Sequence, residues 1–245
     1  MPEGPSIVIV KELVQQFKGK KILQAEGNAK IDPSDFVNKK IVDFKSWGKH
    51  FLICLPKATI RIHFLMFGSY SINEQTKPAR SLRLHLKFTN GDLYFYTCSI
   101  KILEGDLDEI YDWSADVMNE KWSATKAIKK LKAIPGTLAC DALLNQDIFS
   151  GVGNIIKNEV LFRIKLHPES SIGKIPTAVI KAMVKEARKY SFDFLKWKKA
   201  FELKKHWLAH TKKMCARCNI PLIKTYPGKT KRRTFFCTDC QIKYD

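Results

Sequence analysis

The sequence has no apolar run near the roughly 18 residues that a membrane-spanning helix needs, although 45% of its 245 residues are hydrophobic. It starts with MPEGPSIVIV, which has no basic segment before the apolar stretch and no small-residue cleavage site. Internal repeats and low-complexity linkers are also absent. These absences argue against a membrane, secreted or repeat protein, and we expect a globular protein in the cytoplasm.

Acidic residues are scarce, because 24 Asp and Glu stand against 43 Lys and Arg and leave a net charge of +19. Residues 174–206 and 207–245 each carry a net charge of +7, so the excess is concentrated late in the chain. Such a balance favours a polyanionic partner, since neutralised phosphates release counterions. Nucleic acid is the favoured partner, and a solvated basic face is the alternative.

Three of the seven cysteines are single residues in apolar surroundings and are expected to be buried: Cys54, Cys98 and Cys140. The other four form two Cys-x-x-Cys pairs separated by 18 residues, namely Cys215 with Cys218 and Cys237 with Cys240. A redox dithiol needs only one such pair, and disulfides would be unusual without an export signal. The spacing predicts one structural zinc ion, which would stabilise a segment of about 40 residues too small to build its own core.

Hydrophobic periodicity changes along the chain. Apolar residues at helical spacing predict a helix over 5–18, and alternation around Asn90-Gly91 predicts a β-hairpin. Apolar runs at 51–55 and 60–67 complete a mainly antiparallel β-domain. From about residue 120 the period is helical, and four helices are expected, over 123–133, 137–147, 154–164 and 176–197.

A glycine turn, Ser150-Gly151-Val152-Gly153, leads into the helix that starts at Asn154. Such a turn can offer backbone N–H groups to a phosphate, although an ordinary tight turn looks the same. The run from Leu143 to Arg163, closing at His167-Pro168, resembles the helix-two-turn-helix signature of the formamidopyrimidine-DNA glycosylase and endonuclease VIII family. Met1-Pro2-Glu3-Gly4-Pro5 resembles that family's catalytic N-terminus, and the stretch 232–237 resembles its zinc hairpin.

The resemblance implies a multidomain α+β fold. An N-terminal antiparallel β-sandwich with a leading helix would cover 1–118, a helix-two-turn-helix domain 119–206, and a four-cysteine zinc hairpin 207–245. The implied activity is that of a bifunctional DNA glycosylase and AP lyase of base excision repair. Its partner would be double-stranded DNA with oxidised bases or abasic sites, bound by a monomer that associates with the nucleoid.

The chemistry implied by the resemblance needs no cofactor in the reaction. Once Met1 is removed, the secondary amine of Pro2 can attack the sugar C1′ and form a Schiff base, because an α-amino group is partly unprotonated at neutral pH. Glu3 would assist opening of the sugar ring as an acid, and Lys49 would contact DNA beside the lesion. A solvated carboxylate and a surface lysine in a turn are the ordinary alternatives.

A base must leave the stack before Pro2 can reach its sugar, and a side chain must fill the gap. By resemblance that side chain is Met66, within the run His63 to Gly68, although a buried core strand would look much the same. Asn154 and Arg232 are the expected phosphate contacts. His63 is expected to be structural rather than catalytic.

Several positions depart from the family pattern. Ser6 stands where a second glutamate is usual, Asp147 where a basic residue is common, and the zinc loop is about two residues longer. The run 96–101 lacks the Asp-Pro-Arg-Arg-Phe-like loop of the oxidised-purine branch, which favours an endonuclease VIII-like enzyme acting on oxidised pyrimidines. Two other functions remain open: a non-catalytic relative that binds damaged DNA, and an RNA-binding zinc-ribbon protein.

Overall fold

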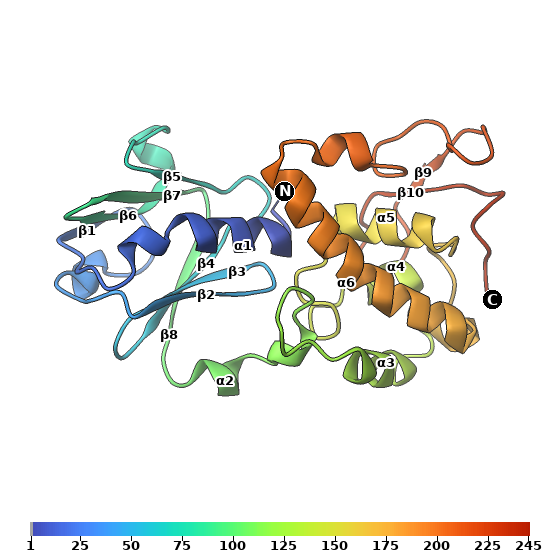
Figure 1. Ribbon diagram of the computed structural model, residues 1–245, viewed down its shortest axis with the longest axis horizontal. Coiled ribbons are helices and arrows are strands. Elements are labelled where there is room, and N and C mark those ends of the chain that lie inside the picture. The colour runs from blue at the N-terminus through green and yellow to red at the C-terminus, as the bar shows by residue number, and fades with distance from the viewer. Residues whose placement is uncertain (1) are drawn as a thin grey trace. The chain divides into compact units, whose positions relative to one another are not determined.

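The computed structural model describes residues 2–245, which divide into two compact units (Figure 1). The first ends at Tyr111 and the second runs from Asp112 to Asp245. The sequence placed a boundary later, after residue 118. The segment between belongs to the second unit because Ser150 donates its N–H to Ala115 O and accepts from Val117 N–H, at 2.8 and 3.1 Å.

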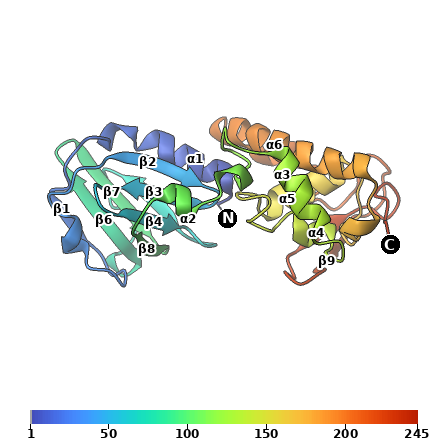
Figure 2. The same cartoon turned by 90° about the horizontal axis from the view of Figure 1, so that it is seen from below.

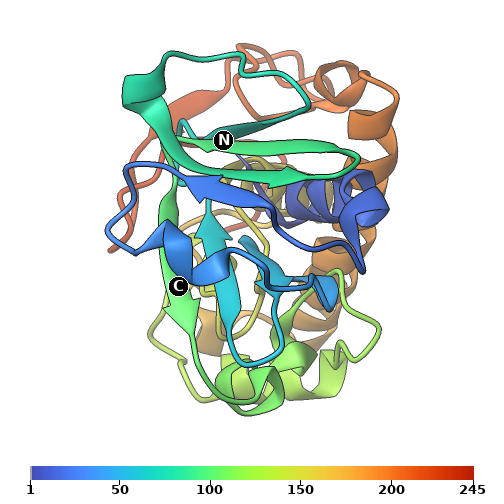
Figure 3. The same ribbon diagram turned by 90° about the vertical axis from the view of Figure 1, so that its left-hand side faces the viewer.

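The first unit is a β-sandwich with a leading helix, α1 (Gly4–Leu13) (Figure 3). All strand pairs in its two four-stranded sheets are antiparallel. In sheet order, one sheet contains β1 (Gln24–Glu26), β6 (Leu82–Phe88), β7 (Gly91–Tyr96) and β5 (Ser69–Ile72). The other contains β2 (Asp43–Trp47), β3 (His50–Cys54), β4 (Thr59–His63) and β8 (Ser99–Leu103). A short helix, α2 (Leu107–Ile110), follows.

The core of the sandwich lies between the sheets and under α1. The rings of Phe51 and Phe95, one from each sheet, lie 6.0 Å apart. Ile7 and Val10 of α1 are fully or almost fully buried in the same cluster, as the helical periodicity predicts. The predicted hairpin is confirmed, with β6 and β7 joined by Thr89 and Asn90.

The second unit is helical and ends in a small hairpin (Figure 2). Its helices are α3 (Ala124–Lys132), α4 (Ala139–Ala142), α5 (Asn154–Arg163) and α6 (Thr177–Lys199). Two strands, β9 (Ile223–Thr225) and β10 (Thr234–Phe236), pair antiparallel in the hairpin. The helices share one apolar core, which includes the buried Cys140. No helix among the described residues is long and apolar enough to cross a membrane.

Two predicted elements are shorter than the sequence indicated. The predicted strand 60–67 ends at His63, and the predicted helix 137–147 is helical only over Ala139–Ala142. In the second case Asn145 competes with the helix, because its Oδ1 accepts the N–H of Asp147 at 2.9 Å and forms a local turn. Apolar patterning therefore predicted that these elements exist but not where each of them ends.

Candidate catalytic and nucleic-acid-binding site

Pro2 and Glu3 directly precede α1. Glu3 caps the helix and is fully buried, and its carbonyl accepts the N–H of Ser6 at 2.8 Å. Pro5 lies in the first turn, where a proline needs no partner for its nitrogen. Pro2 is partly buried. Met1, whose removal we predict, lies outside the residues that the structure describes. The first turn thus fixes the backbone of the predicted acid immediately after the predicted nucleophile.

Lys49 lies in the two-residue turn between β2 and β3. Gly48 supplies the turn with a φ of +53°, a conformation that glycine adopts without steric cost. The side chain of Lys49 is half-buried, and α1 packs against both strands of this hairpin. The fold therefore packs the two strands that flank Lys49 against the helix that follows Glu3.

Two histidines lie beside Lys49 on neighbouring strands. The rings of His50 and His63 are 5.5 Å apart in an edge-to-face arrangement, and His50 Nδ1 lies 3.0 Å from the hydroxyl of Tyr111. Burial first, and then the charge of Arg61, lowers the pKa of His50 to about 3. Burial and the charge of Lys49 also lower the pKa of His63. Both rings are therefore neutral at pH 7, and the cationic groups here are the lysine and the arginine.

The loop after β4 exposes three large apolar side chains. Leu65, Met66 and Phe67 are 51%, 51% and 77% exposed. His63 Nδ1 accepts the N–H of Leu65 at 3.1 Å and holds the turn, in which Leu65 has a φ of +54°. Met66 is therefore not part of a buried core strand, the alternative that the sequence left open. His63 has the structural role that we expected.

The glycine turn before α5 is fixed by Gln146. Its Nε2 donates to the carbonyls of Leu144 and Val152 at 2.7 and 3.2 Å, and its Oε1 accepts the N–H of Gly151 at 3.2 Å. Gly151 has a φ of +97°, which favours glycine. This bonding holds the backbone just ahead of the first helical residue, Asn154.

Asn154 is 8% exposed and contacts the hairpin rather than solvent. Its Nδ2 donates to the carbonyl of Arg233 at 2.9 Å, and its Oδ1 is buried without a hydrogen-bond partner among the described residues. Arg232, the other predicted phosphate contact, is exposed and lies two residues before the start of β10. The structure thus brings Asn154 to the backbone beside Arg232, and a direct phosphate contact by either residue stays a prediction.

Three consecutive polar residues of α5 were not singled out as site residues from the sequence. The buried Lys157 donates to Thr234 Oγ1 at 2.6 Å, and Asn158 Oδ1 accepts the N–H of Phe235 at 3.0 Å. Glu159 is fully buried and accepts backbone N–H groups of residues 208–210 at 2.8 to 3.0 Å. A signal was available in the apolar residues on both sides of these three, Ile155 and Ile156 before them and Val160 to Phe162 after them, because polar groups buried among apolar residues need partners.

A carboxylate on α4 holds the loop of the hairpin. Asp141 accepts the N–H groups of Lys229 and Thr230 at 2.8 and 3.1 Å, and the Thr230 hydroxyl at 2.6 Å. Gly228 fits against it with a φ of +69°, and a Cβ there would lie 2.2 Å from the carboxylate. The loop that contains Arg232 is therefore held by α4 at residues 229–230 and by Asn154 of α5 at the carbonyl of Arg233.

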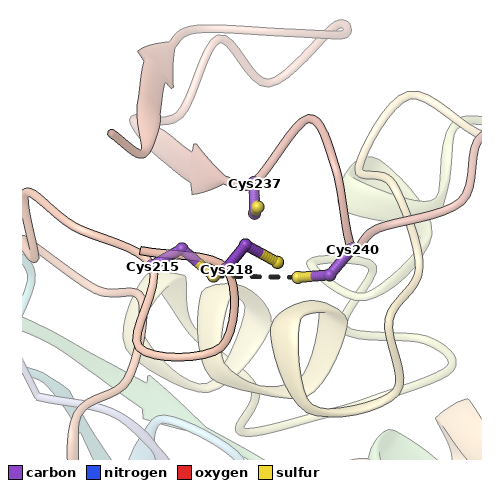
Figure 4. A group of neighbouring side chains, drawn as sticks. All are labelled: Cys215, Cys218, Cys237 and Cys240. Atoms are coloured by element: carbon purple, nitrogen blue, oxygen red, sulfur yellow. Dashed lines mark hydrogen bonds between the residues drawn. The ribbon is translucent and has the colours of Figure 1, made fainter. Parts of the chain in front are cut away.

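The four paired cysteines converge at the base of the hairpin (Figure 4). Their sulfur atoms lie within 4.8 Å of one another, and the Sγ atoms of Cys215 and Cys240 are 3.8 Å apart. Zinc–sulfur bonds of about 2.3 Å in a tetrahedron give sulfur separations of about 3.8 Å. Burial alone would raise the pKa of Cys215, but backbone N–H groups of Arg217 and Cys218 hold it at about 7. The cluster can hold a metal ion.

Comparisons with known proteins match both units. The formamidopyrimidine-DNA glycosylase N-terminal domain matches residues 1–99, and the H2TH domain of the same glycosylase matches residues 114–193. The chain belongs to the formamidopyrimidine-DNA glycosylase and endonuclease VIII family. Its α+β fold, with antiparallel sheets, a helix-two-turn-helix domain and a four-cysteine cluster, is the one the sequence predicted.

Relatives come from both branches of the family. Endonuclease 8-like 3 of Xenopus laevis is 29% identical over 90% of this chain, but the match covers only 38% of that longer protein. Formamidopyrimidine-DNA glycosylase of Mycoplasmopsis pulmonis is 29% identical over 100% of this chain and 99% of its own length. This chain therefore spans a full-length bacterial relative and little more than a third of the animal one.

Solved structures of the family share the fold. A viral DNA glycosylase superposes with a TM-score of 0.86 at 21% identity, covering 98% of this chain and 100% of its own. Lactococcus lactis formamidopyrimidine-DNA glycosylase, bound to DNA containing an AP site, gives the same TM-score and identity over the same shares of the two chains. The agreement extends over nearly the whole chain, the four-cysteine segment included.

Proposed function

We propose that this protein is a DNA glycosylase with AP lyase activity that acts in base excision repair. The observation that carries the proposal is the Pro2-Glu3 pair at the start of α1, in a chain whose fold and family are those of such enzymes. The net charge of +19 and the exposed Arg232 suit a duplex DNA partner, bound by a monomer.

The reaction follows from the chemistry of a secondary amine. Pro2 nitrogen bonds to C1′ of the damaged nucleotide, the bond from C1′ to the base breaks, and the base leaves with a proton. Glu3 donates a proton to the ring oxygen as the sugar opens, and an iminium forms. The iminium withdraws electrons, so loss of a proton from C2′ expels the 3′ phosphate, and a second elimination expels the 5′ phosphate. Lys49 would hold the phosphate backbone beside the lesion.

Oxidised pyrimidines are the proposed substrates. β7 ends at Tyr96 and β8 starts at Ser99, so only Thr97 and Cys98 join them, and Cys98 is buried. The connection has no room for the Asp-Pro-Arg-Arg-Phe-like loop of the oxidised-purine branch. Met66 is exposed on its loop, as a side chain that replaces a displaced base must be.

A zinc ion is the proposed occupant of the four-cysteine cluster. Its role would be structural, because all four positions of a tetrahedral site are taken by thiolates and none is left for a substrate. When bound, the ion would stabilise the base of the hairpin that carries Arg232.

Single-turnover base release tests the proposal. Matched duplexes would carry an oxidised pyrimidine, an oxidised purine or an abasic site, with released base measured by mass spectrometry and nicks by denaturing electrophoresis. We expect release and nicking at the oxidised pyrimidine and nicking at the abasic site. Tight binding without release would instead support a non-catalytic damage-binding protein, and a preference for structured RNA would support the zinc-ribbon alternative.

A further inference from the structure

A groove of about 580 Å³ is lined by residues of α3 and α6, the two helices labelled in Figure 2, and by Trp122 just ahead of α3. Aliphatic side chains, including Ile128 and Val184, line it. Two aromatic residues contribute to its walls: Trp122, which is partly buried, and Phe192, which is 42% exposed. A concave site that combines apolar side chains with a few charged groups is typical of a binding site for another molecule.

Cations line the α6 side of this groove at a regular spacing. Lys181, Lys185 and Lys189 are four residues apart, so they form a row with about 6 Å between successive positions. Lys189 pairs with Asp193 at 3.0 Å, whereas Lys181 and Lys185 are exposed and form no ion pair with any described residue. The row therefore presents unneutralised positive charge at intervals of one helical turn.

Arg188 stiffens the wall of the groove instead of adding to the row. Its guanidinium donates to the carbonyls of Val117 and Asn119 at 3.3 and 2.9 Å and lies 5.2 Å from the centre of the Phe192 ring. These contacts restrain the aromatic side chain, since the guanidinium beside its ring is itself held by the two bonds that Nη1 donates. The groove is thus preformed.

We propose that the groove binds an acidic amphipathic helix of a partner protein. Such a helix would place aliphatic side chains on Ile128 and Phe192 and would place carboxylates, one turn apart, beside Lys181 and Lys185. The chain itself carries +19 net charges, which disfavours a second copy as the occupant. Charge complementarity therefore selects an acidic partner.

Single-stranded nucleic acid fits this groove less well. Bases need open aromatic faces to stack on, but Arg188 lies over Phe192, and Trp122 packs near Phe149 with ring centres 6.0 Å apart. None of the lining residues is among the predicted DNA contacts. Within the second unit, α3 lies on the opposite side of α5 from β9 and β10 (Figure 1). The groove therefore does not overlap the predicted DNA contacts of the second unit, Asn154 and Arg232.

The test uses a fluorescent synthetic peptide of 16 residues, helical, with leucines on one face and glutamates along one flank. A scrambled peptide of the same composition is its control. We expect the peptide to bind the full-length protein in the micromolar range and the scrambled one to bind at least tenfold more weakly. In the double variant K181E/K185E peptide binding should fall at least tenfold, while affinity for abasic duplex DNA stays within twofold.

A control variant distinguishes binding that depends on the groove lysines from binding that depends only on the net positive charge of the protein. Lys198→Glu changes an exposed lysine of α6 outside the groove, and peptide binding should stay within twofold. Phe192→Ala should weaken binding with an unchanged circular dichroism spectrum. The proposal is overturned if no peptide binds, if Lys198→Glu acts as strongly as the groove variant, or if a single-stranded oligonucleotide binds through Lys181 and Lys185 and displaces the peptide.

Discussion

At the residue scale, two partly buried neutral histidines, His50 and His63, make the first unit sensitive to acid. The pKa of His50 is lowered from 6.5 to about 3, so the unfolded chain binds a proton at a higher pH than the folded one. The contribution of this neutral ring to the free energy of unfolding is therefore complete above pH 6.5 and is lost progressively as the pH falls toward 3. At pH 5 the loss from this one ring is about 2 kcal/mol.

Urea unfolding checks this dependence. We expect His50→Gln to flatten the fall in unfolding free energy between pH 7 and pH 5, whereas His206→Gln, in the second unit and outside this cluster, should leave it unchanged. An equally steep fall in His50→Gln would show that other groups control the acid sensitivity.

A second residue-scale prediction concerns Met66. Because the side chain is half exposed, Met66→Ala should change the unfolding free energy by less than about 1 kcal/mol. It should nevertheless reduce excision from duplex DNA at least tenfold and from single strands much less, since only the duplex must be unstacked. Ile62→Ala, at a fully buried position of β4, is the contrast and should cost about 2–5 kcal/mol. Equal losses on both substrates would contradict a role in base displacement.

The sequence predicted residue types at the site better than their surroundings. The spacing of the cysteine pairs predicted a metal cluster by itself, whereas Pro2 and Glu3 were predicted from a short motif that resembles the family's N-terminus. The contacts of Asn154 with Arg233 and of Asp141 with Thr230 join residues 79 and 89 positions apart. No periodicity in a single sequence records such pairs, because they depend on how separate elements pack.

At the scale of elements, the hairpin depends on α4 as well as on its metal site. Removing the Asp141 carboxylate leaves three donors of the loop without their acceptor. We expect Asp141→Ala to weaken binding to abasic duplex DNA about tenfold, with zinc content unchanged.

Asp147→Ala is the matched control for that variant. It removes the same charge from an exposed carboxylate near α5, so its DNA binding should be unchanged or slightly tighter. If both variants bind DNA as the unchanged protein does, Asp141 does not position the hairpin.

A separate prediction concerns the zinc ion proposed for the four-cysteine cluster. Cys237 is fully buried and supplies one of the four clustered sulfur atoms, so loss of its thiol should unfold the base of the hairpin. Cys237→Ser should lose the bound zinc and most DNA affinity, while thermal unfolding of the β-sandwich changes little. Cys54→Ser, a buried cysteine outside the cluster, should keep its zinc. Full DNA affinity in zinc-free protein would contradict the structural role.

Element boundaries illustrate what pattern alone misses. The apolar run 60–67 predicts a single strand, but the chain turns after His63 because that ring accepts the N–H of Leu65. Apolar residues at 65–67 are exposed against the usual rule, and an exposed apolar cluster is itself a sign of a binding surface. Sequence and structure therefore disagree at a segment to which we assign a function.

At the scale of the whole molecule, the proposed enzyme activity depends on one covalent step. The positive charge and the zinc hairpin would be expected equally of a non-catalytic protein that binds DNA. Only an enzyme of the proposed kind forms an iminium between Pro2 and the sugar.

Borohydride trapping tests that step most directly. Borohydride reduces an iminium to a stable amine, so protein that begins at Pro2 should form a covalent adduct with abasic or oxidised-pyrimidine duplex DNA. Protein that retains Met1 should form almost none, because its Pro2 nitrogen is within a peptide bond. We expect peptide mass spectrometry to place the adduct on Pro2. If zinc-loaded protein that begins at Pro2 binds these duplexes but yields neither adduct nor nick, the proposed enzyme activity is wrong.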